Sequence, residues 1–355
     1  MPSAVDWAVA QRVAVRVAGR EPFSESYHSD SLESDFVELT EQAEALVAAE
    51  TGLVSLAGPA RARVTDRAGW INANVASFQR LLRPILEKIS SRLTDSALTP
   101  VAQKLAGAEV GVVLGWMSTR VLGQYDLLII EEESPLDQDL VYYVGPNVLS
   151  LEKQFAFPPR EFRLWLALHE VTHRAQFTGI EWMRPYFLDL VTQTLDSVEP
   201  DPKRFLAVLG RLAEARRTGA NPLADGGIMA LVASDAQREV LDRVSGLMSL
   251  LEGHGDITMD RAGAGLVPSA ERFSRVLRQR RESAQGLARL LQQLIGLEAK
   301  MNQYAQGERF IRAVEDVGGP SLLATAWESP DRLPTLQEIR DPASWIARVA
   351  PALAG

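Results

Sequence analysis

A short segment with two histidines and a glutamate, His169-Glu170-Val171-Thr172-His173, constrains the fold more than any other feature of this chain. Residues four apart on a helix lie one above the other, so a helix would direct the imidazoles of His169 and His173 to one point. Glu170 would lie about 100° around the helix from His169, close to that point but outside it. The chain holds only 4 histidines in 355 residues, so two at this spacing indicate a metal site carried by a helix.

The residues around the motif predict a buried helix over 160–178. Apolar side chains recur at helical spacing on both sides of this segment. Pro158 and Pro159 precede it and Gly179 follows it, which are the expected start and stop signals. The motif is therefore expected in the middle of a helix.

Two imidazoles and a neighbouring carboxylate suit the chemistry of a zinc hydrolase. Catalytic zinc takes three protein ligands and leaves a fourth position to water. Glu170 would act as general base and pass the proton to a leaving amine, which implies hydrolysis of an amide or related acyl bond. Because the chain has no cysteine, zinc would need imidazole and carboxylate ligands. The simpler interpretation is that both histidines are ordinary helical residues and that Glu170 forms a surface ion pair.

Glu252 and His254 are rival candidates for the third zinc ligand. Glu252 ends an apolar run that starts at Val244, and a carboxylate beside such a stripe needs a compensating charge such as a divalent cation. His254 lies on the opposite flank, where it could instead donate a hydrogen bond to an oxyanion. Glu252 or Asp256 could also orient an imidazole without binding the metal. We expect Glu252 to be the ligand. The competing interpretation is a helix end capped by Gly253 and Gly255, with His254 complementing the helix dipole.

Several segments together resemble one family: Val5-Asp6-Trp7-Ala8, Val121-Leu122-Gly123-Gln124-Tyr125-Asp126, Tyr142-Tyr143-Val144-Gly145-Pro146-Asn147, HEVTHRAQF and LEGHGD. They are similar to the zincin-like metallopeptidase family of bacterial proteins labelled as hydrolases, some of them associated with deazaflavin-coenzyme biosynthesis. The resemblance implies a mainly helical zincin-like fold and a metallopeptidase-type site at His169, Glu170 and His173. It implies no substrate. The separation from His173 to Glu252 is longer than is typical of the better-known zincins.

Helical periodicity dominates the chain, which predicts a mainly α fold with a small hairpin or sheet before the motif helix. We expect one domain over residues 1–355, with a possible division into a catalytic core, 1–260, and a helical extension, 261–355. The only strands expected are 127–133 and 140–145. The expected helices span 3–18, 34–50, 69–93, 100–122, 160–178, 183–198, 202–218, 235–252, 269–282, 284–304 and 308–317.

The strand over Leu140–Val144 suggests how a substrate would bind. In the zincins that the chain resembles, a sheet edge beside the metal helix binds extended peptide, and this strand could offer that edge. A small hairpin that only covers the core is the competing interpretation. Tyr142, Tyr143 and Tyr186 are candidate hydrogen-bond donors to an oxyanion, although packing alone would account for them.

The charge balance narrows the range of partners. A net charge of −9 argues against broad nucleic-acid binding, which needs a basic surface. Gly107, Gly111 and Gly115 recur at the spacing of membrane helix dimers, but nearby charged residues leave too short an apolar run to span a bilayer. The N-terminus does not resemble an export signal, so a cytoplasmic location is expected. The oligomeric state is not predicted.

The sequence thus predicts a zinc-dependent hydrolase, a metallopeptidase that cleaves a peptide or protein substrate. Zn²⁺ would be held by His169, His173 and Glu252, with Glu170 as base. The alternative is a catalytically silent zincin-like scaffold that binds a peptide or protein, because buried His–Glu pairs can also persist as hydrogen-bonded core networks.

Overall fold

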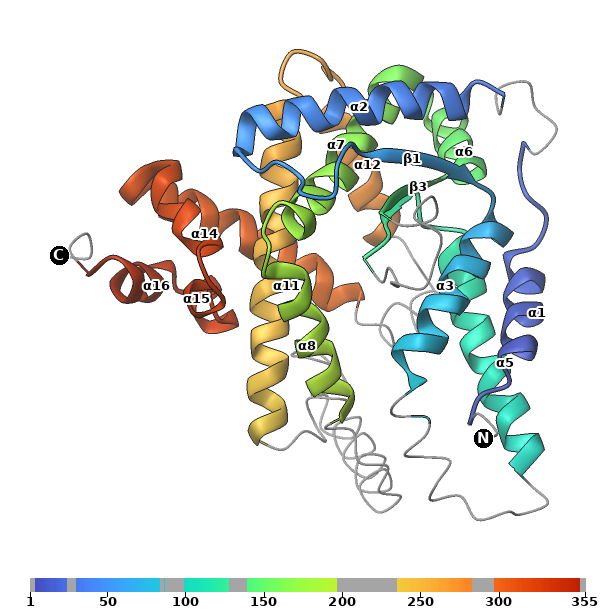
Figure 1. Cartoon of the computed structure of the whole chain (residues 1–355). Coiled ribbons are helices and arrows are strands. Elements are labelled where there is room, and N and C mark those ends of the chain that lie inside the picture. Colours follow the sequence, from blue (N-terminus) through green and yellow to red (C-terminus); the bar gives the residue numbers. More distant parts are fainter. Residues whose placement is uncertain are drawn as a thin grey trace. The chain divides into compact units, whose positions relative to one another are not determined.

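The computed structural model describes residues 4–23, 30–83, 86, 99–127, 139–196, 235–282 and 297–351 (Figure 1). The chain forms two compact units. The first holds Met1–Gly179 and Thr258–Leu277, and the second holds Ile180–Ile257 and Arg278–Gly355. Helices dominate both units, which confirms the mainly α class. The expectation of one domain, with a possible division near residue 260, stays a prediction.

The first unit contains a three-stranded sheet with helices around it. The helix that carries the motif, α7, begins at Pro159 and ends at Thr178, so the expectation for 160–178 is confirmed. The other elements are α1 (Trp7–Ala18), α2 (Leu32–Thr51), β1 (Arg61–Thr65), α3 (Arg67–Leu81), α5 (Thr99–Ser118), β2 (Gly123–Tyr125), β3 (Leu140–Val144) and α6 (Gly145–Phe155).

Strand β3 lies in the middle of the sheet. It pairs in parallel with β1 and antiparallel with β2, in the order β1-β3-β2. The expectation that Leu140–Val144 forms a substrate-binding edge is therefore wrong, because both sides of this strand are already paired. Within the described residues the edge beside α7 is β2. The strand expected at 127–133 lies almost entirely outside the described residues.

Helices α2 and α7 cover one face of the sheet. They pack against each other, with α2 also on β1 and α7 on β2, and Figure 1 shows α2 running alongside β1. Tyr143 of β3 points to this face, where its ring stacks on Phe36 of α2 at a centroid distance of 3.8 Å. Its hydroxyl lies 2.8 Å from Thr40 Oγ1. The motif helix is thus packed between α2 and the sheet.

Helices α1, α3 and α5 cover the opposite face. Val144 of β3 belongs to a buried cluster with Trp70 of α3, Ala14 of α1 and Leu114 of α5. Side chains alternate between the faces along a strand, so Tyr143 points to the α2 side while Val144 points to the α3 side. The first unit is therefore a three-layer structure of helices, sheet and helices.

The glycines of α5 allow a close approach to α1. A Cβ atom at Gly111 would lie 2.5 Å from the carbonyl oxygen of Ala10, and one at Gly115 would lie 2.4 Å from that of Ala14. Only a residue without a side chain fits at such distances. The glycine repeat therefore serves helix packing within the protein. None of the helices in the described part of the chain has both the length and the apolar content needed to cross a membrane.

The second unit is built from helices in the described part of the chain. The helix α11 (Asp235–Ala262) and the helix α12 (Ala270–Glu282) each have residues in both units. The other elements are α8 (Met183–Asp196), α14 (Leu297–Ala324), the 3-10 turns η2 (Thr325–Trp327) and η3 (Pro330–Arg332), α15 (Leu336–Arg340) and α16 (Pro342–Val349).

Helix α11 continues straight through Gly253 and Gly255, so the interpretation of this segment as a capped helix end is wrong. The glycine has a packing role instead, because a Cβ atom at Gly253 would lie 2.4 Å from the carbonyl carbon of Gly307 in α14. Gly253 and Gly307 thus allow α11 and α14 to cross with their backbones in contact. The expected helix 202–218 lies outside the described residues.

Candidate metal centre

The two histidines of the motif face the same side of α7. Their ring centroids are 4.7 Å apart and their planes are inclined by 86°. Both side chains are half-buried, whereas most of the other residues of α7 are buried. The four-residue spacing therefore brings the two imidazoles together on one helix, as predicted from the sequence.

A glutamine one turn further along fixes the orientation of the second imidazole. His173 Nδ1 lies 2.9 Å from Oε1 of Gln176, whose side chain is fully buried. When the amide oxygen accepts the Nδ1 proton, the lone pair of the ring is on Nε2, which is the atom that would bind a cation. The contact of Gln176 with His173 was not predicted from the sequence. The three-residue spacing, which places both side chains on one side of a helix, could have indicated it.

The carboxylate of Glu170 is buried, with 7% of the residue exposed. Its Oε2 accepts the backbone N–H of Tyr125 in β2 at 3.1 Å. A Cβ atom at Gly123 would lie 2.7 Å from Oε1 of the same carboxylate. The interpretation of Glu170 as a surface ion-pair residue is therefore wrong, because the group lies between α7 and the edge strand.

The two rival third ligands both lie on α11, in the second unit. Glu252 is 3% exposed and His254 is 7% exposed. The ring of His254 meets Trp327 edge to face at a centroid distance of 5.2 Å, which gives this imidazole an aromatic packing partner. A buried carboxylate such as Glu252 requires a compensating positive charge or hydrogen-bond donors.

Among the described residues, His169 and His173 on α7 each offer an imidazole nitrogen, and Glu252 on α11 offers a carboxylate oxygen, as ligand atoms for a metal ion. Two imidazole nitrogens and one carboxylate oxygen are a common ligand set for catalytic zinc, and the absence of cysteine agrees with it. The residues present therefore fit the metal that the motif implies. The fourth histidine, His28, lies outside the described residues.

Tyr143 has a packing role in this structure. Burial raises the pKa of its phenol, the contact with Thr40 opposes that rise, and the negative charge of Glu170 adds to it. Since the hydroxyl already pairs with Thr40 on α2, Tyr143 is not placed to donate to an oxyanion. Of the two interpretations that the sequence left open for this residue, the structure supports packing.

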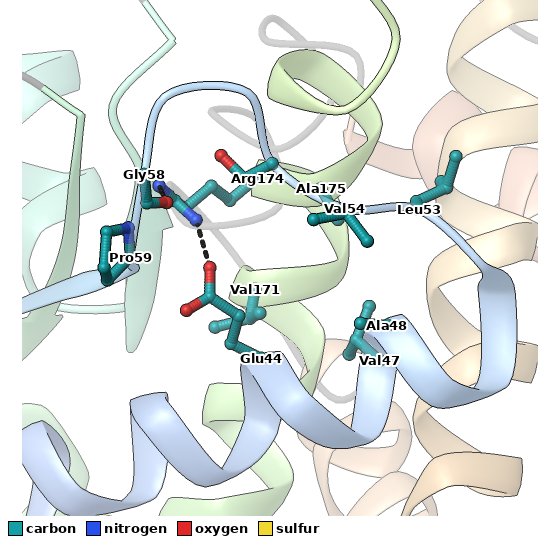
Figure 2. A pocket seen from close by; sticks show the side chains of 11 residues that line it. Glu44, Val47, Ala48, Leu53, Val54, Gly58, Pro59, Val171, Arg174 and Ala175 are labelled. Carbon is teal, nitrogen blue, oxygen red and sulfur yellow. Dashed lines mark hydrogen bonds and ion pairs between the residues drawn. The ribbon is translucent and has the colours of Figure 1, made fainter.

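A separate apolar pocket of about 220 Å³ lies on another side of α7 (Figure 2). Val47 of α2, Val54 of the following loop and Val171 of α7 line it, and Arg174 and Glu44 meet at one end. Neither histidine of the motif nor Glu170 contributes to its wall. The pocket is therefore distinct from the candidate metal centre.

A helix that carries HExxH beside a small sheet defines the zincin class of protein. Residues 5–346 match the family model described as zincin-like metallopeptidase. The chain therefore belongs to the zincin-like metallopeptidase family, which confirms the resemblance read from its motifs.

One solved structure is similar over nearly the full length of both chains. It is a crystal structure from Chloroflexus aurantiacus described as "a putative hydrolase with a novel fold". The sequence identity is 30%, the TM-score is 0.72, and the match covers 97% of this chain and 98% of the other. Among curated proteins, none matches this chain.

Proposed function

We propose that this protein is a zinc-dependent hydrolase that cleaves peptide or related amide bonds. One observation carries the proposal: the Glu170 carboxylate is buried and held by Tyr125 N–H, on the helix where the rings of His169 and His173 meet at 4.7 Å. This arrangement pairs two metal ligands with a fixed general base. Membership of the zincin-like metallopeptidase family supports the same chemistry.

The ligands proposed for zinc are His169, His173 and Glu252. Glu252 is favoured over His254 because it supplies a negative charge that compensates the cation, whereas the His254 ring packs against Trp327. The two histidines belong to the first unit and Glu252 to the second. The proposal therefore requires that α11 bring this carboxylate to α7.

Zinc bound by these residues would acidify a water molecule and polarise the carbonyl of the substrate. Glu170 would accept a proton from that water as the water oxygen attacks the carbonyl carbon. The carbon–nitrogen bond then breaks, and Glu170 returns the proton to the departing amine. The products are one carboxylic acid and one amine, so that one water molecule is consumed.

The edge strand β2 limits how a peptide substrate could pair with the sheet. Gly123 and Tyr125 stand opposite Tyr143 and Val141 in the antiparallel register. The N–H of Tyr125 is already taken by Glu170, so an added strand would not receive this hydrogen bond. We therefore infer that recognition of a peptide or protein substrate depends mainly on contacts other than a continuous strand on β2.

A scaffold that binds a peptide or protein without turnover is the second candidate. The buried hydrogen bond between Glu170 and Tyr125 favours it, because the same contact would stabilise the fold in the absence of catalysis. The hydrolase would need zinc and would cleave a peptide, whereas the scaffold would bind a peptide and leave it intact.

Metal analysis of the purified protein, followed by cleavage of a peptide library with and without chelator, distinguishes these functions. The hydrolase proposal expects stoichiometric zinc and cleavage that the chelator abolishes. Bound zinc without cleavage would favour the scaffold, and failure to bind added zinc would overturn the proposed centre. Cytoplasmic localisation stays a prediction that this experiment does not address.

Three variants test the individual roles. Glu170→Gln should retain zinc and lose turnover, because the amide cannot accept the proton. His173→Ala and Glu252→Ala should each lower the zinc content. Retention of zinc by Glu252→Ala would exclude it as a ligand and make His254→Ala the next variant. Glu41→Gln, at an exposed position on α2, is the matched control for removal of a carboxylate.

A further inference from the structure

We propose that the edge strand β2 is a positioning device for Glu170, and that Gln124 fixes this strand from its other face. The inference rests on the proposed role of Glu170 as general base. It adds three residues to the catalytic apparatus: Gly123 and Tyr125, which contact the carboxylate, and Gln124, which acts on it through the strand.

Two alternate residues of β2 form the seat of the carboxylate. The N–H of Tyr125 donates to Oε2 at 3.1 Å. At Gly123, a Cβ atom would lie 2.7 Å from both Oε1 and Cγ of Glu170. The absence of a side chain at Gly123 therefore makes room for the carboxylate, while the amide of Tyr125 fixes one of its oxygens.

The side chain between these two residues points to the opposite face and is clamped by α3. Gln124 Oε1 accepts the indole N–H of Trp70 at 2.8 Å, and its Nε2 donates to Asn74 Oδ1 at 3.3 Å. Asn74 in turn donates through Nδ2 to the carbonyl oxygen of Trp70 at 2.9 Å. Trp70 is 2% exposed and Asn74 is 8% exposed, so these polar groups have little access to water. The three hydrogen bonds form a closed loop that is buried at Asn74 and half-buried at Gln124.

Strand β2 needs this clamp because its own pairing is short. It spans Gly123–Tyr125 and lies at the edge of the sheet within the described residues. Its flanks bond to β3 through Asp126 N–H to Leu140 O at 3.0 Å and Val144 N–H to Leu122 O at 2.8 Å. The Gln124 side chain adds a perpendicular restraint to α3. Gly123 and Tyr125 thus position Glu170, whereas Gln124 fixes the strand to α3 from the opposite face.

Loss of the Gln124 clamp should therefore reduce catalysis without touching the reacting atoms. A displacement of a catalytic group by about 1 Å can lower a rate by about 100-fold. Gln124→Leu removes both hydrogen bonds on the α3 side, and Gly123→Ala presses directly on the Glu170 carboxylate. Both variants should lower kcat by about 10- to 100-fold, with KM and zinc content near the wild-type values.

A double-mutant cycle separates positioning from a general structural effect. In the Glu170→Gln background there is no general base to position, so Gln124→Leu should have little further effect on the residual rate. Gln11→Leu is the matched control, because it removes an exposed hydrogen bond of 2.8 Å to Asn72 on the same helix α3. We expect this control to keep wild-type kcat in both backgrounds. Equal losses from Gln124→Leu with and without Glu170 would overturn the proposal.

Hydrogen exchange of the Tyr125 amide gives a readout that needs neither activity nor metal. The amide should be protected in the wild type and exchange faster in Glu170→Ala and Gln124→Leu, but not in Gln11→Leu. If the wild type has no hydrolytic activity but shows this exchange pattern, the proposed function is wrong, whereas the proposal that β2 positions Glu170 is supported. If the protein is active and Gln124→Leu matches the wild type in kcat and in Tyr125 amide exchange, the positioning proposal is wrong and the proposed function is unaffected.

A conservative variant covers the case in which Gln124→Leu does not fold. Gln124→Glu keeps an acceptor for the Trp70 indole, but it loses the donation to Asn74 and places a carboxylate oxygen opposite Asn74 Oδ1. The kcat and the Tyr125 protection should therefore fall between those of the wild type and Gly123→Ala. Wild-type values for both Gln124→Glu and Gly123→Ala would overturn the proposal.

Discussion

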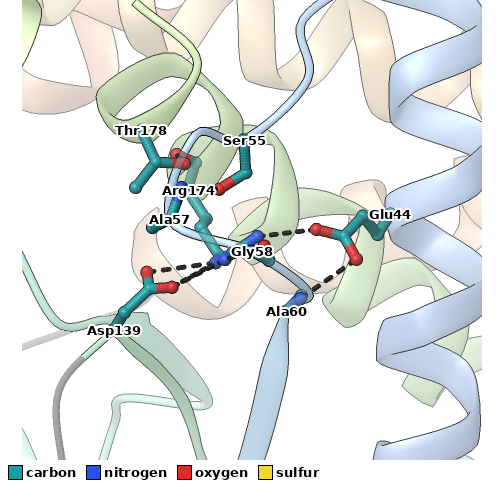
Figure 3. A network of polar contacts seen from close by, with 8 residues as sticks. All are labelled: Glu44, Ser55, Ala57, Gly58, Ala60, Asp139, Arg174 and Thr178. Carbon is teal, nitrogen blue, oxygen red and sulfur yellow. Dashed lines mark hydrogen bonds and ion pairs between the residues drawn. The ribbon is translucent and has the colours of Figure 1, made fainter. Parts of the chain in front are cut away.

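Arg174 and Asp139 form a buried ion pair in which Arg174 Nη2 lies 2.6 Å from Asp139 Oδ2 (Figure 3). The same guanidinium donates from Nη1 to Glu44 Oε1 at 2.7 Å and from Nη2 to the carbonyl oxygen of Gly58 at 2.7 Å. Arg174 follows His173 directly, so these contacts tie the motif helix to the residue before β3, to α2 and to the loop after α2. The helix with both imidazoles is therefore anchored at the residue directly after its second histidine.

Removal of Arg174 should strongly destabilise the first unit. Arg174→Ala would leave the Asp139 and Glu44 carboxylates without their cation, and breaking a buried pair in this way costs about 3–5 kcal/mol. Urea denaturation followed by circular dichroism measures the change in the free energy of unfolding. Arg160→Ala is the control, because its pair with Glu38 is exposed to solvent on both sides and should contribute nothing measurable. Similar midpoints for the two variants would contradict the anchoring role of Arg174.

The extent to which the sequence predicted this structure depends on the range of the interactions involved. Helix α7 was predicted because its signals are local: apolar periodicity, Pro158 at the start and Gly179 at the end. Strand β1 was missed, since Arg61 and Arg63 give it a polar composition and its formation depends on pairing with β3. Helix α6 was also missed. The strand expected over 140–145 includes Gly145, which is the first residue of this helix.

In the candidate metal centre, too, features set by local sequence were predicted and features set by long-range contacts were not. The i, i+4 histidines and the adjacent glutamate could be read directly from the sequence, because a helix alone sets their relative positions. The seat of Glu170 could not, since Tyr125 lies 45 residues away along the chain and reaches the carboxylate only through sheet pairing. The network of Gln124, Trp70 and Asn74 likewise joins residues that are 50 or more positions apart.

The contact between Gln176 and His173 should strengthen metal binding. Gln176→Ala removes the acceptor that holds the Nδ1 proton of His173, so zinc affinity should fall by about 10- to 100-fold. Competition with a chromophoric chelator measures the affinity. Gln154→Ala on α6, at an exposed position, should keep the wild-type value. Unchanged affinity in Gln176→Ala would mean that the orientation of His173 is fixed by other contacts.

The glycine contacts between α1 and α5 should tolerate no added side chain. In Gly111→Ala the new methyl group would meet the carbonyl oxygen of Ala10 and the Cβ of Val13, so the helices must separate at a cost of about 1–3 kcal/mol. Thermal and urea denaturation measure the loss. Leu105→Ala on the same helix, where the side chain is exposed, should change the stability by no more than about 0.5 kcal/mol. A stable Gly111→Ala protein would show that α1 and α5 can separate freely.

Tyr143 should make the stability fall at alkaline pH. Burial is the main cause that raises the pKa of its phenol above the ordinary value of about 10, and the charge of Glu170 adds to the rise. Above about pH 10 the unfolded chain therefore loses a proton that the folded chain keeps, so the free energy of unfolding falls as pH increases. Below that pH the stabilising contribution is complete.

The variant Tyr143→Phe isolates this effect. It removes the titrating group and also the contact with Thr40, so it should be about 1 kcal/mol less stable than the wild type at neutral pH. Because the phenylalanine has no proton to lose, its stability should decline less steeply above about pH 10, and the difference between the two proteins should narrow. Urea denaturation at several pH values measures both curves. Parallel curves through the alkaline range would mean that the Tyr143 phenol titrates alike in the folded and unfolded chains.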